Sequence, residues 1–324
     1  MKYVRKNFPT NKITLVSDLV NNEALALRVG VNFWLASNPK IVWSNQFEAL
    51  GKSSKYRNGF WFNTKARFLS LDEYMQKNNA GPIIHLEGDV WLAPYFPFGA
   101  FLALEELIAY PITNRTSGIA STLYLRNSEA SKLLCDFSAS FASTKWDASD
   151  VEILGALKDT FPSLVRLLKS APEDQTLIRE DSLLPKLSEI MTREIFETRG
   201  IFDGSSFGIH LLGEDPRNNF GHKKLFGKLA NHSVEVSKVD FRVQKNVLEI
   251  FEKDSHIPIY SLHVHSKDTS MFKFDSWEKT ILRKLKKRQN GQSSEFIIKS
   301  FALFVLDYTK ISINYLKRKL ITHE

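Results

Sequence analysis

The chain has 324 residues, of which 43% are hydrophobic, 25% charged and 12% aromatic. These proportions exclude a disordered, collagen-like or coiled-coil chain, and the length fits one large α/β domain or two modest ones. Lys and Arg exceed Asp and Glu by 44 to 36, and most of the excess lies in residues 271–324. Because the rest of the chain is nearly neutral, no nucleic-acid partner is expected.

The cysteine content and the first residues indicate the cellular compartment in which the protein is expected. Cys135 is the single cysteine, which excludes an internal disulfide and a cysteine-based zinc site. The basic first residues are not followed by an apolar stretch of signal-peptide length, and residues 296–306 are too few to span a bilayer. We expect a cytoplasmic protein whose contact with the inner face of the cell membrane, where it occurs, is peripheral.

Short apolar runs that close on polar residues characterise the first part of the chain. Residues 13–16 are followed by Asp18, and residues 41–43 by Ser44 and Asn45. Buried parallel strands whose carboxyl ends carry ligand groups have this pattern. We therefore expect two strands of a parallel sheet here.

The segments around these strands alternate between helix and strand. Residues 22–36 have helical spacing, and residues 67–71 indicate a third strand that leads into a helix at 72–76. Residues 78–82 favour a turn by composition. This alternation predicts an α/β fold.

The segment with the most chemistry is residues 82–92, where an apolar run delivers Glu87 and Asp89 to the end of an expected central strand. Residues two apart on a strand share one side, so both carboxylates can face one point, where like charges are costly unless a cation lies between them. Gly88 lets a ligand approach the backbone. Such oxygen ligands suit Mg²⁺ or Mn²⁺; the alternative is a solvated strand end. His85 is expected to be a hydrogen-bonded core histidine.

A second apolar strand, starting at residue 258, also ends in polar groups. His263 and His265 share one side of it, and Lys267 follows. Histidine is a frequent metal ligand, and lysine is a point charge suited to phosphate. Alone, this pattern favours an ordinary strand with one partly buried histidine. Together with the two acids, it supplies a nitrogen ligand and a cation for a diphosphate–metal site.

In these two elements the sequence resembles the GT-A glycosyltransferases, which use a nucleotide-diphosphate sugar and a metal held by a DxD-type motif. Glu87–Gly88–Asp89 looks like that motif in an ExD form. His265, or in second place His263, sits where several families of this fold have a late histidine on the metal. The resemblance therefore implies that Glu87, Asp89 and His265 hold Mn²⁺ or Mg²⁺.

The resemblance extends over residues 10–275 and implies further roles. Donor binding, at the nucleotide, its phosphates or the sugar, falls to Asp18, Ser44, Asn45, Arg126 and Lys267.

Three acids are candidate catalytic carboxylates: Asp150, Asp174 and Asp203. Asp174 lies in a segment that resembles the acceptor-side acidic element of the family. Asp203 lies in a stretch that resembles bacterial polysaccharide-type glycosyltransferases, although an Asp–Gly step also makes an ordinary turn. For Asp150 the favoured alternative is a helix start that is capped by Ser149 or by Asp150 itself.

The sequence thus predicts a GT-A catalytic domain at residues 1–275 and a basic helical tail at 276–324. The expected activity is metal-dependent transfer of a hexose from a nucleotide-diphosphate sugar to a glycan or lipid-linked acceptor, with retention favoured over inversion. Two other classes stay open. A metal-dependent phosphoesterase could use the same acids and histidines, and a non-catalytic glycan- or membrane-binding protein could keep the same fold.

The tail has two interpretations. Trp277, Ile281 and Leu285 recur every four residues among basic side chains, and after a break at residues 286–295 the chain again has amphipathic helical spacing. The tail can pack on the catalytic domain as an ordinary C-terminal helix. It can instead attach to an anionic membrane surface through its basic and apolar residues.

Overall fold

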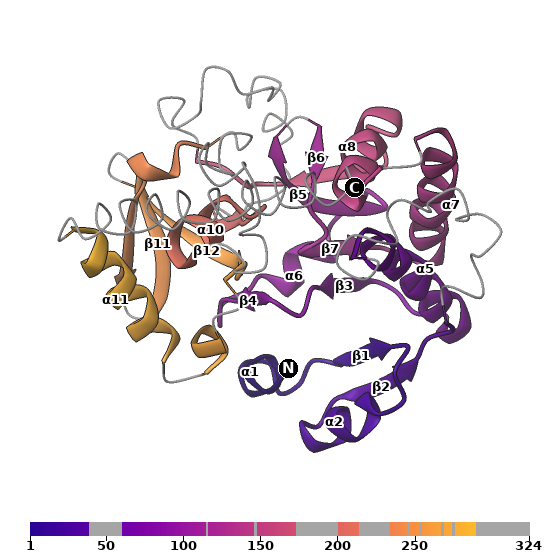
Figure 1. Cartoon of the computed structure of the whole chain (residues 1–324), viewed down its shortest axis with the longest axis horizontal. Coiled ribbons are helices and arrows are strands. Elements are labelled where there is room, and N and C mark those ends of the chain that lie inside the picture. The colour runs from indigo at the N-terminus through magenta and orange to yellow at the C-terminus, as the bar shows by residue number, and fades with distance from the viewer. Residues whose placement is uncertain are drawn as a thin grey trace, which may run out of the picture. The chain divides into compact units, whose positions relative to one another are not determined.

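The computed structural model describes residues 1–38, 60–114, 116–145, 148–172, 200–213, 234–244, 246–252, 255–266, 269–273 and 276–289. The chain divides into a unit Met1–Glu278 and a second unit Lys279–Glu324. The first unit combines helices with several β-sheets (Figure 1), so the predicted α/β class is confirmed. Within the described ranges, every helix is too short or too polar to cross a bilayer.

The chain begins with a helix and a β–α–β unit. Its elements are α1 (Lys2–Asn7), β1 (Thr14–Ser17), α2 (Asn22–Arg28) and β2 (Asn32–Leu35). β1 and β2 pair in parallel, and β1 confirms the strand predicted at residues 13–16. The helix predicted at residues 22–36 is wrong in its second half. Gly30 has a φ of 69°, and this left-handed backbone ends the helix before β2 begins.

Helix α5 (Phe60–Asn78) stands where a strand was predicted at residues 67–71. Phe68, Leu71 and Met75 are buried and recur with the spacing of one helix face, which packs against α7 (Ser128–Thr144). A window of five residues is too short to distinguish a helical from a strand period. The strand prediction was therefore wrong.

The first large sheet carries the larger part of the core. Its strands are β3 (Ile83–Leu86), β5 (Ile108–Asn114), β6 (Ser117–Gly118), β7 (Thr122–Leu125) and β8 (Val165–Leu168). The order is β3-β7-β5-β6, with β8 beside β5, and β3 runs antiparallel to β7. Helices α5, α7 and α8 (Asp150–Thr160) contribute to the same core. It includes Tyr110, Leu123, Leu134 and Leu154.

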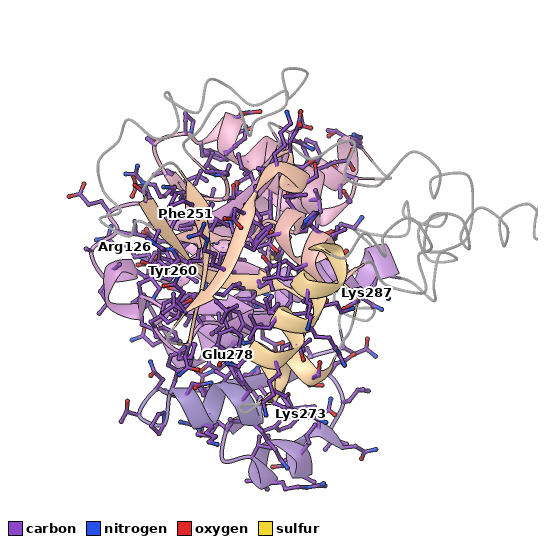
Figure 2. The ribbon with its side chains drawn as sticks, turned by 90° about the vertical axis from the view of Figure 1, so that its left-hand side faces the viewer. Arg126, Phe251, Tyr260, Lys273, Glu278 and Lys287 are labelled. Carbon is purple, nitrogen blue, oxygen red and sulfur yellow. The ribbon has the colours of Figure 1, made fainter. Side chains whose placement is uncertain are left out.

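The second large sheet takes over where β3 ends. Its strands are β4 (Val90–Leu92), β9 (Ile201–Phe202), β10 (Asp240–Gln244), β11 (Val247–Glu252) and β12 (Ser255–His263). The order is β10-β11-β12-β4, and β9 also pairs with β12. β11 and β12 lie toward the viewer in Figure 2, where Phe251 and Tyr260 mark them. Residues 82–92 are therefore two strands in two sheets, and Glu87, Gly88 and Asp89 form the link between them.

Short helices complete the described fold. They are α6 (Phe98–Phe101), α10 (Ser206–Leu212), η7 (Val236–Lys238), η8 (Thr269–Phe272) and α11 (Trp277–Gln289). The Trp277 ring lies 4.8 Å from that of Trp91. α11 continues through residues 286–289, where the sequence predicted the start of a break. The second predicted tail helix lies outside the described residues.

Candidate metal centre

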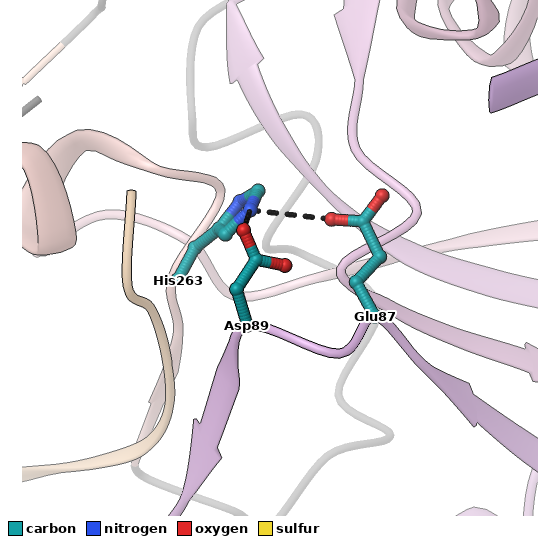
Figure 3. Close-up of side chains that lie close together, drawn as sticks. All are labelled: Glu87, Asp89 and His263. Atoms are coloured by element: carbon teal, nitrogen blue, oxygen red, sulfur yellow. Dashed lines mark hydrogen bonds and ion pairs between the residues drawn. The ribbon is translucent and has the colours of Figure 1, made fainter. Parts of the chain in front are cut away.

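Two carboxylates and an imidazole converge where the two sheets meet. Glu87, Asp89 and His263 each offer one ligand atom, and these atoms lie within 4.8 Å of one another. His263 Nε2 is 3.2 Å from Glu87 Oε2 and 3.3 Å from Asp89 Oδ2 (Figure 3). Neighbouring ligands of an octahedral ion with bonds of about 2.1 Å lie about 3 Å apart. The donor set and its spacing therefore fit Mg²⁺ or Mn²⁺.

Backbone hydrogen bonds fix the turn that carries the two acids. Val90 N–H donates to Glu87 O at 3.1 Å, which closes the turn, and Glu87 N–H donates to Ser121 O at 3.3 Å. Val264 N–H donates to Asp89 O at 2.8 Å. The turn is thus tied to both sheets. A Cβ built on Gly88 would meet nothing within 4 Å, so the backbone there faces open space, as a ligand approach requires.

The structure brings His263 rather than His265 to the acids. β12 ends at His263, which pairs with Val90 next to the turn. Beyond the strand end the chain bends, because His265 N–H donates to His263 O at 3.0 Å. The His265 ring then lies 3.9 Å from the His263 ring, between centroids. Strand alternation does not apply past the end of the strand, so His263, in place of His265, is the candidate nitrogen ligand.

Asp203 contacts the backbone of His263 and accepts a hydrogen bond from its N–H. The Asp203 carboxylate is fully buried and absent from the cavity wall. Burial raises its pKa against the opposing effect of its hydrogen bonds. It accepts four backbone N–H groups at 2.8–3.1 Å, those of Ser205, Phe207, Gly208 and His263. This satisfied carboxylate is a structural anchor, so the prediction of a catalytic Asp203 is revised.

A partly buried arginine joins two of the acids. Arg67 lies on α5, and its Nη1 donates to Glu87 Oε1 while its Nη2 donates to Asp150 Oδ2. Burial lowers the pKa of Arg67, but Glu87 and Asp150 outweigh it and raise the pKa. Burial raises the pKa of Glu87, but Arg67 and then His263 lower it overall. Arg67 was not among the predicted site residues, since its partners Glu87 and Asp150 are distant in the sequence.

Asp150 is the first residue of α8. Ser149 caps this helix, and its side chain accepts from Glu152 N–H at 3.3 Å while Ser149 N–H donates to Glu152 Oε2 at 2.9 Å. The predicted cap at Ser149 is confirmed. Asp150 is 5% exposed. In addition to its place in the first turn of the helix, it forms an ion pair with Arg67.

One cavity of about 1620 Å³ gathers these groups. The candidate site residues on its wall are Asp18, Glu87, Asp89, Asp150, His263 and His265. Asp18, which follows β1, is exposed on the same wall. Its role in binding the nucleotide stays a prediction.

Arg126 lies at the wrong end of its strand for donor binding. In the antiparallel pair, Leu86 is opposite Thr122 and Ile83 is opposite Leu125. Arg126 therefore lies at the beginning of β3, while Glu87 follows its end. Its side chain is exposed and donates to Glu105 O. The prediction of a donor-binding Arg126 rested on the resemblance of residues 120–127 to a strand that helps cradle the donor sugar, and the antiparallel pairing corrects it.

The remaining predicted residues divide into two groups. Ser44, Asn45, Asp174 and Lys267 lie outside the described residues. His85 lines the cavity rather than the core, and its Nε2 has no hydrogen-bond partner in the described part of the chain. The expectation of a hydrogen-bonded core histidine is therefore wrong for Nε2.

Comparison with known protein families, with curated protein sequences and with solved structures finds no significant match to the chain. The geometry of the cavity is therefore what supports a function. Its main elements are the three converging ligand atoms, the partly buried Arg67 and the turn between the two sheets.

Proposed function

We propose that the protein is a metal-dependent glycosyltransferase of the GT-A type, which moves a hexose from a nucleotide-diphosphate sugar to a glycan or lipid-linked acceptor. The observation that carries the proposal is the convergence of Glu87, Asp89 and His263 on the cavity wall. These ligands come from an acidic turn between two sheets and from the end of a late strand. This is the arrangement expected of an ExD motif completed by a histidine.

The charge of the site suits a divalent cation. Glu87, Asp89 and Asp150 carry three carboxylates, and Arg67 compensates one of them. Mn²⁺ or Mg²⁺ at this position would neutralise the charge that develops on a departing diphosphate. The cavity exceeds the range of about 300–1,000 Å³ that is usual for a single small ligand, which leaves room for a donor and an acceptor.

The pairing of Asp150 bears on stereochemistry. An inverting transfer needs a general base for the acceptor proton, whereas a retaining transfer can use the leaving phosphate. Because Asp150 is engaged by Arg67, its carboxylate is not available as that base. We therefore keep retention in the proposal, with the acceptor proton passing to the departing phosphate.

The proposal is tested by thermal unfolding of the full chain with nucleotide sugars, with and without Mn²⁺. A ligand at about 100 times its Kd stabilises the native state by about 2.7 kcal/mol, so Tm should rise with at least one nucleotide sugar and only with metal. Asp89→Ala should abolish the rise. The matched control Asp136→Ala, at an exposed acid paired with Lys132 on α7, should retain it.

The same assay distinguishes the roles of His263 and His265. His263→Ala should weaken the Mn²⁺-dependent rise more than His265→Ala, because only His263 approaches both acids. Failure of every nucleotide sugar to raise Tm, with Mn²⁺ alone still raising it, would contradict the glycosyltransferase and leave a metal-binding protein. Metal-dependent release of phosphate from simple phosphate esters would favour the phosphoesterase.

A further inference from the structure

Arg67 and Asp150 form a pair behind the acidic turn that the proposed chemistry does not use. We infer that Arg67, held by Asp150, is a positioning residue for Glu87. It occupies one oxygen of the carboxylate, so that the other faces the metal position. This inference rests on the proposed metal site and deepens it.

The two oxygens of Glu87 have different partners. Oε1 accepts from Arg67 Nη1, and Oε2 lies 3.2 Å from His263 Nε2. A carboxylate without the first contact could rotate about its terminal torsion, which is broad and roughly two-fold in glutamate. The Arg67 contact therefore selects the orientation in which Oε2 joins Asp89 and His263.

Arg67 is itself held in place, by the packing of its helix at one end of the side chain and by contacts of the guanidinium at the other. Its helix is anchored by the adjacent side chain of Phe68, which is fully buried, and the guanidinium carbon lies 5.4 Å from the centre of that ring. Its Nη2 contacts Asp150, which is 5% exposed at the capped start of α8. Three elements that are far apart in the sequence thus meet at one guanidinium.

The chemistry of this pair is specific to arginine. The guanidinium is a planar fork that can bridge two carboxylates, whereas a lysine ammonium is a point charge. The side chains of Arg67 and Glu87 are each 18% exposed and that of Asp150 is 6% exposed. The three side chains are thus largely covered by protein where they meet the cavity wall.

A charge-conserving substitution separates positioning from simple charge compensation. Arg67→Lys keeps the positive charge but cannot bridge Glu87 and Asp150. If Arg67 only compensates charge, Mn²⁺ affinity should stay as in the parent. If Arg67 positions Glu87, affinity should fall about 10-fold or more, the usual loss when a partner behind a metal ligand is removed.

The measurement is the Kd of the full chain for MnCl₂ alone, read from the electron paramagnetic resonance signal of free Mn²⁺. Asp150→Glu is the second variant, because it also conserves charge while displacing the carboxylate that holds Arg67. The matched control is Arg166→Lys, at a buried arginine that pairs with Glu106 at 2.5 Å outside the cavity. The control should lower Tm without changing the Kd.

A double-mutant cycle identifies the route of the effect. In a Glu87→Gln background, Arg67→Lys should add little further loss of affinity, because the two residues act through one contact. Parental Kd values in folded Arg67→Lys or Asp150→Glu would overturn the inference while leaving the metal site intact. A parent that binds no Mn²⁺ would overturn the metal site itself, which is a distinguishable result. If Arg67→Lys does not fold, the Kd of Asp150→Glu decides.

Discussion

At the scale of single residues, His85 is a sensitive reporter of the folded cavity. Burial, followed by the nearby Arg67, lowers its pKa from 6.5 to about 4. The folded chain therefore binds fewer protons at this site than the unfolded chain between those values. The contribution of a neutral His85 to stability is present above pH 6.5 and is lost as the pH falls toward 4.

The expected outcome is a steeper acid destabilisation in the parent than in His85→Gln. The difference in the free energy of unfolding should grow by up to about 3 kcal/mol across this window. Urea unfolding at a series of pH values, followed by circular dichroism, measures it. Parallel pH profiles for the two proteins would show that His85 titrates normally in the folded state.

The same scale shows which site residues a sequence can reveal. Glu87 and Asp89 were predictable because an apolar run delivered two acids to one point. His263 and His265 differ only in how the chain bends after β12, which depends on pairing with β4. Arg67 carried no local signal, since its importance arises from Glu87 and Asp150, which are 20 and 83 residues away.

At the scale of elements, α10 and β12 approach so closely that one position admits only glycine. A Cβ on Gly208 would lie 1.8 Å from His263 O and 2.9 Å from Asp203 Oδ2. Both neighbours belong to the anchored end of β12. The backbone of α10 would therefore have to move away from the strand to accept a side chain.

Gly208→Ala should accordingly lower the free energy of unfolding by about 1–3 kcal/mol, the usual cost of overpacking, and weaken Mn²⁺ binding through His263. Gly99→Ala is the control, because its Cβ would meet nothing within 4 Å in α6. Urea unfolding of both variants provides the comparison. Equal stabilities would mean that α10 yields without affecting β12.

The elements themselves were only partly predictable. β1, β12 and the start of α8 carry clear local signals, apolar runs and a cap, and the structure has them there. The strand character of β2 and the length of α5 depend on packing partners. The polar residues 87–89 mark the end of β3 in the sequence, but the membership of β3 and β4 in different sheets depends on their pairing partners.

At the scale of the whole molecule, the basic C-terminal region is the feature to test. In α11 the side chains of Arg283, Lys286 and Lys287 are exposed. Each basic residue near an anionic bilayer contributes about 1 kcal/mol. Several of them together would therefore favour attachment to an anionic bilayer.

We therefore expect the full chain to sediment with anionic vesicles at low salt and to be released at high salt. A triple variant, Arg283→Glu, Lys286→Glu and Lys287→Glu, should lose this binding while keeping the Tm of the parent. Neutral vesicles serve as the control. Absence of pelleting with anionic lipid would instead favour an ordinary C-terminal helix.

The position of the acid cluster at the meeting of two sheets also has a consequence for assembly of the chain. Asp89 and His263 are 174 residues apart, so an ion bound to both acts as a cross-link that closes most of the chain into one loop. Closing so long a loop lowers the conformational entropy of the chain. In the folded chain the two sheets have already brought the loop ends together, so the ion does not bear that cost. Under the proposed function, tight metal binding would thus be a property of the completed chain, and the acidic turn alone, which is synthesised early, would bind the ion weakly.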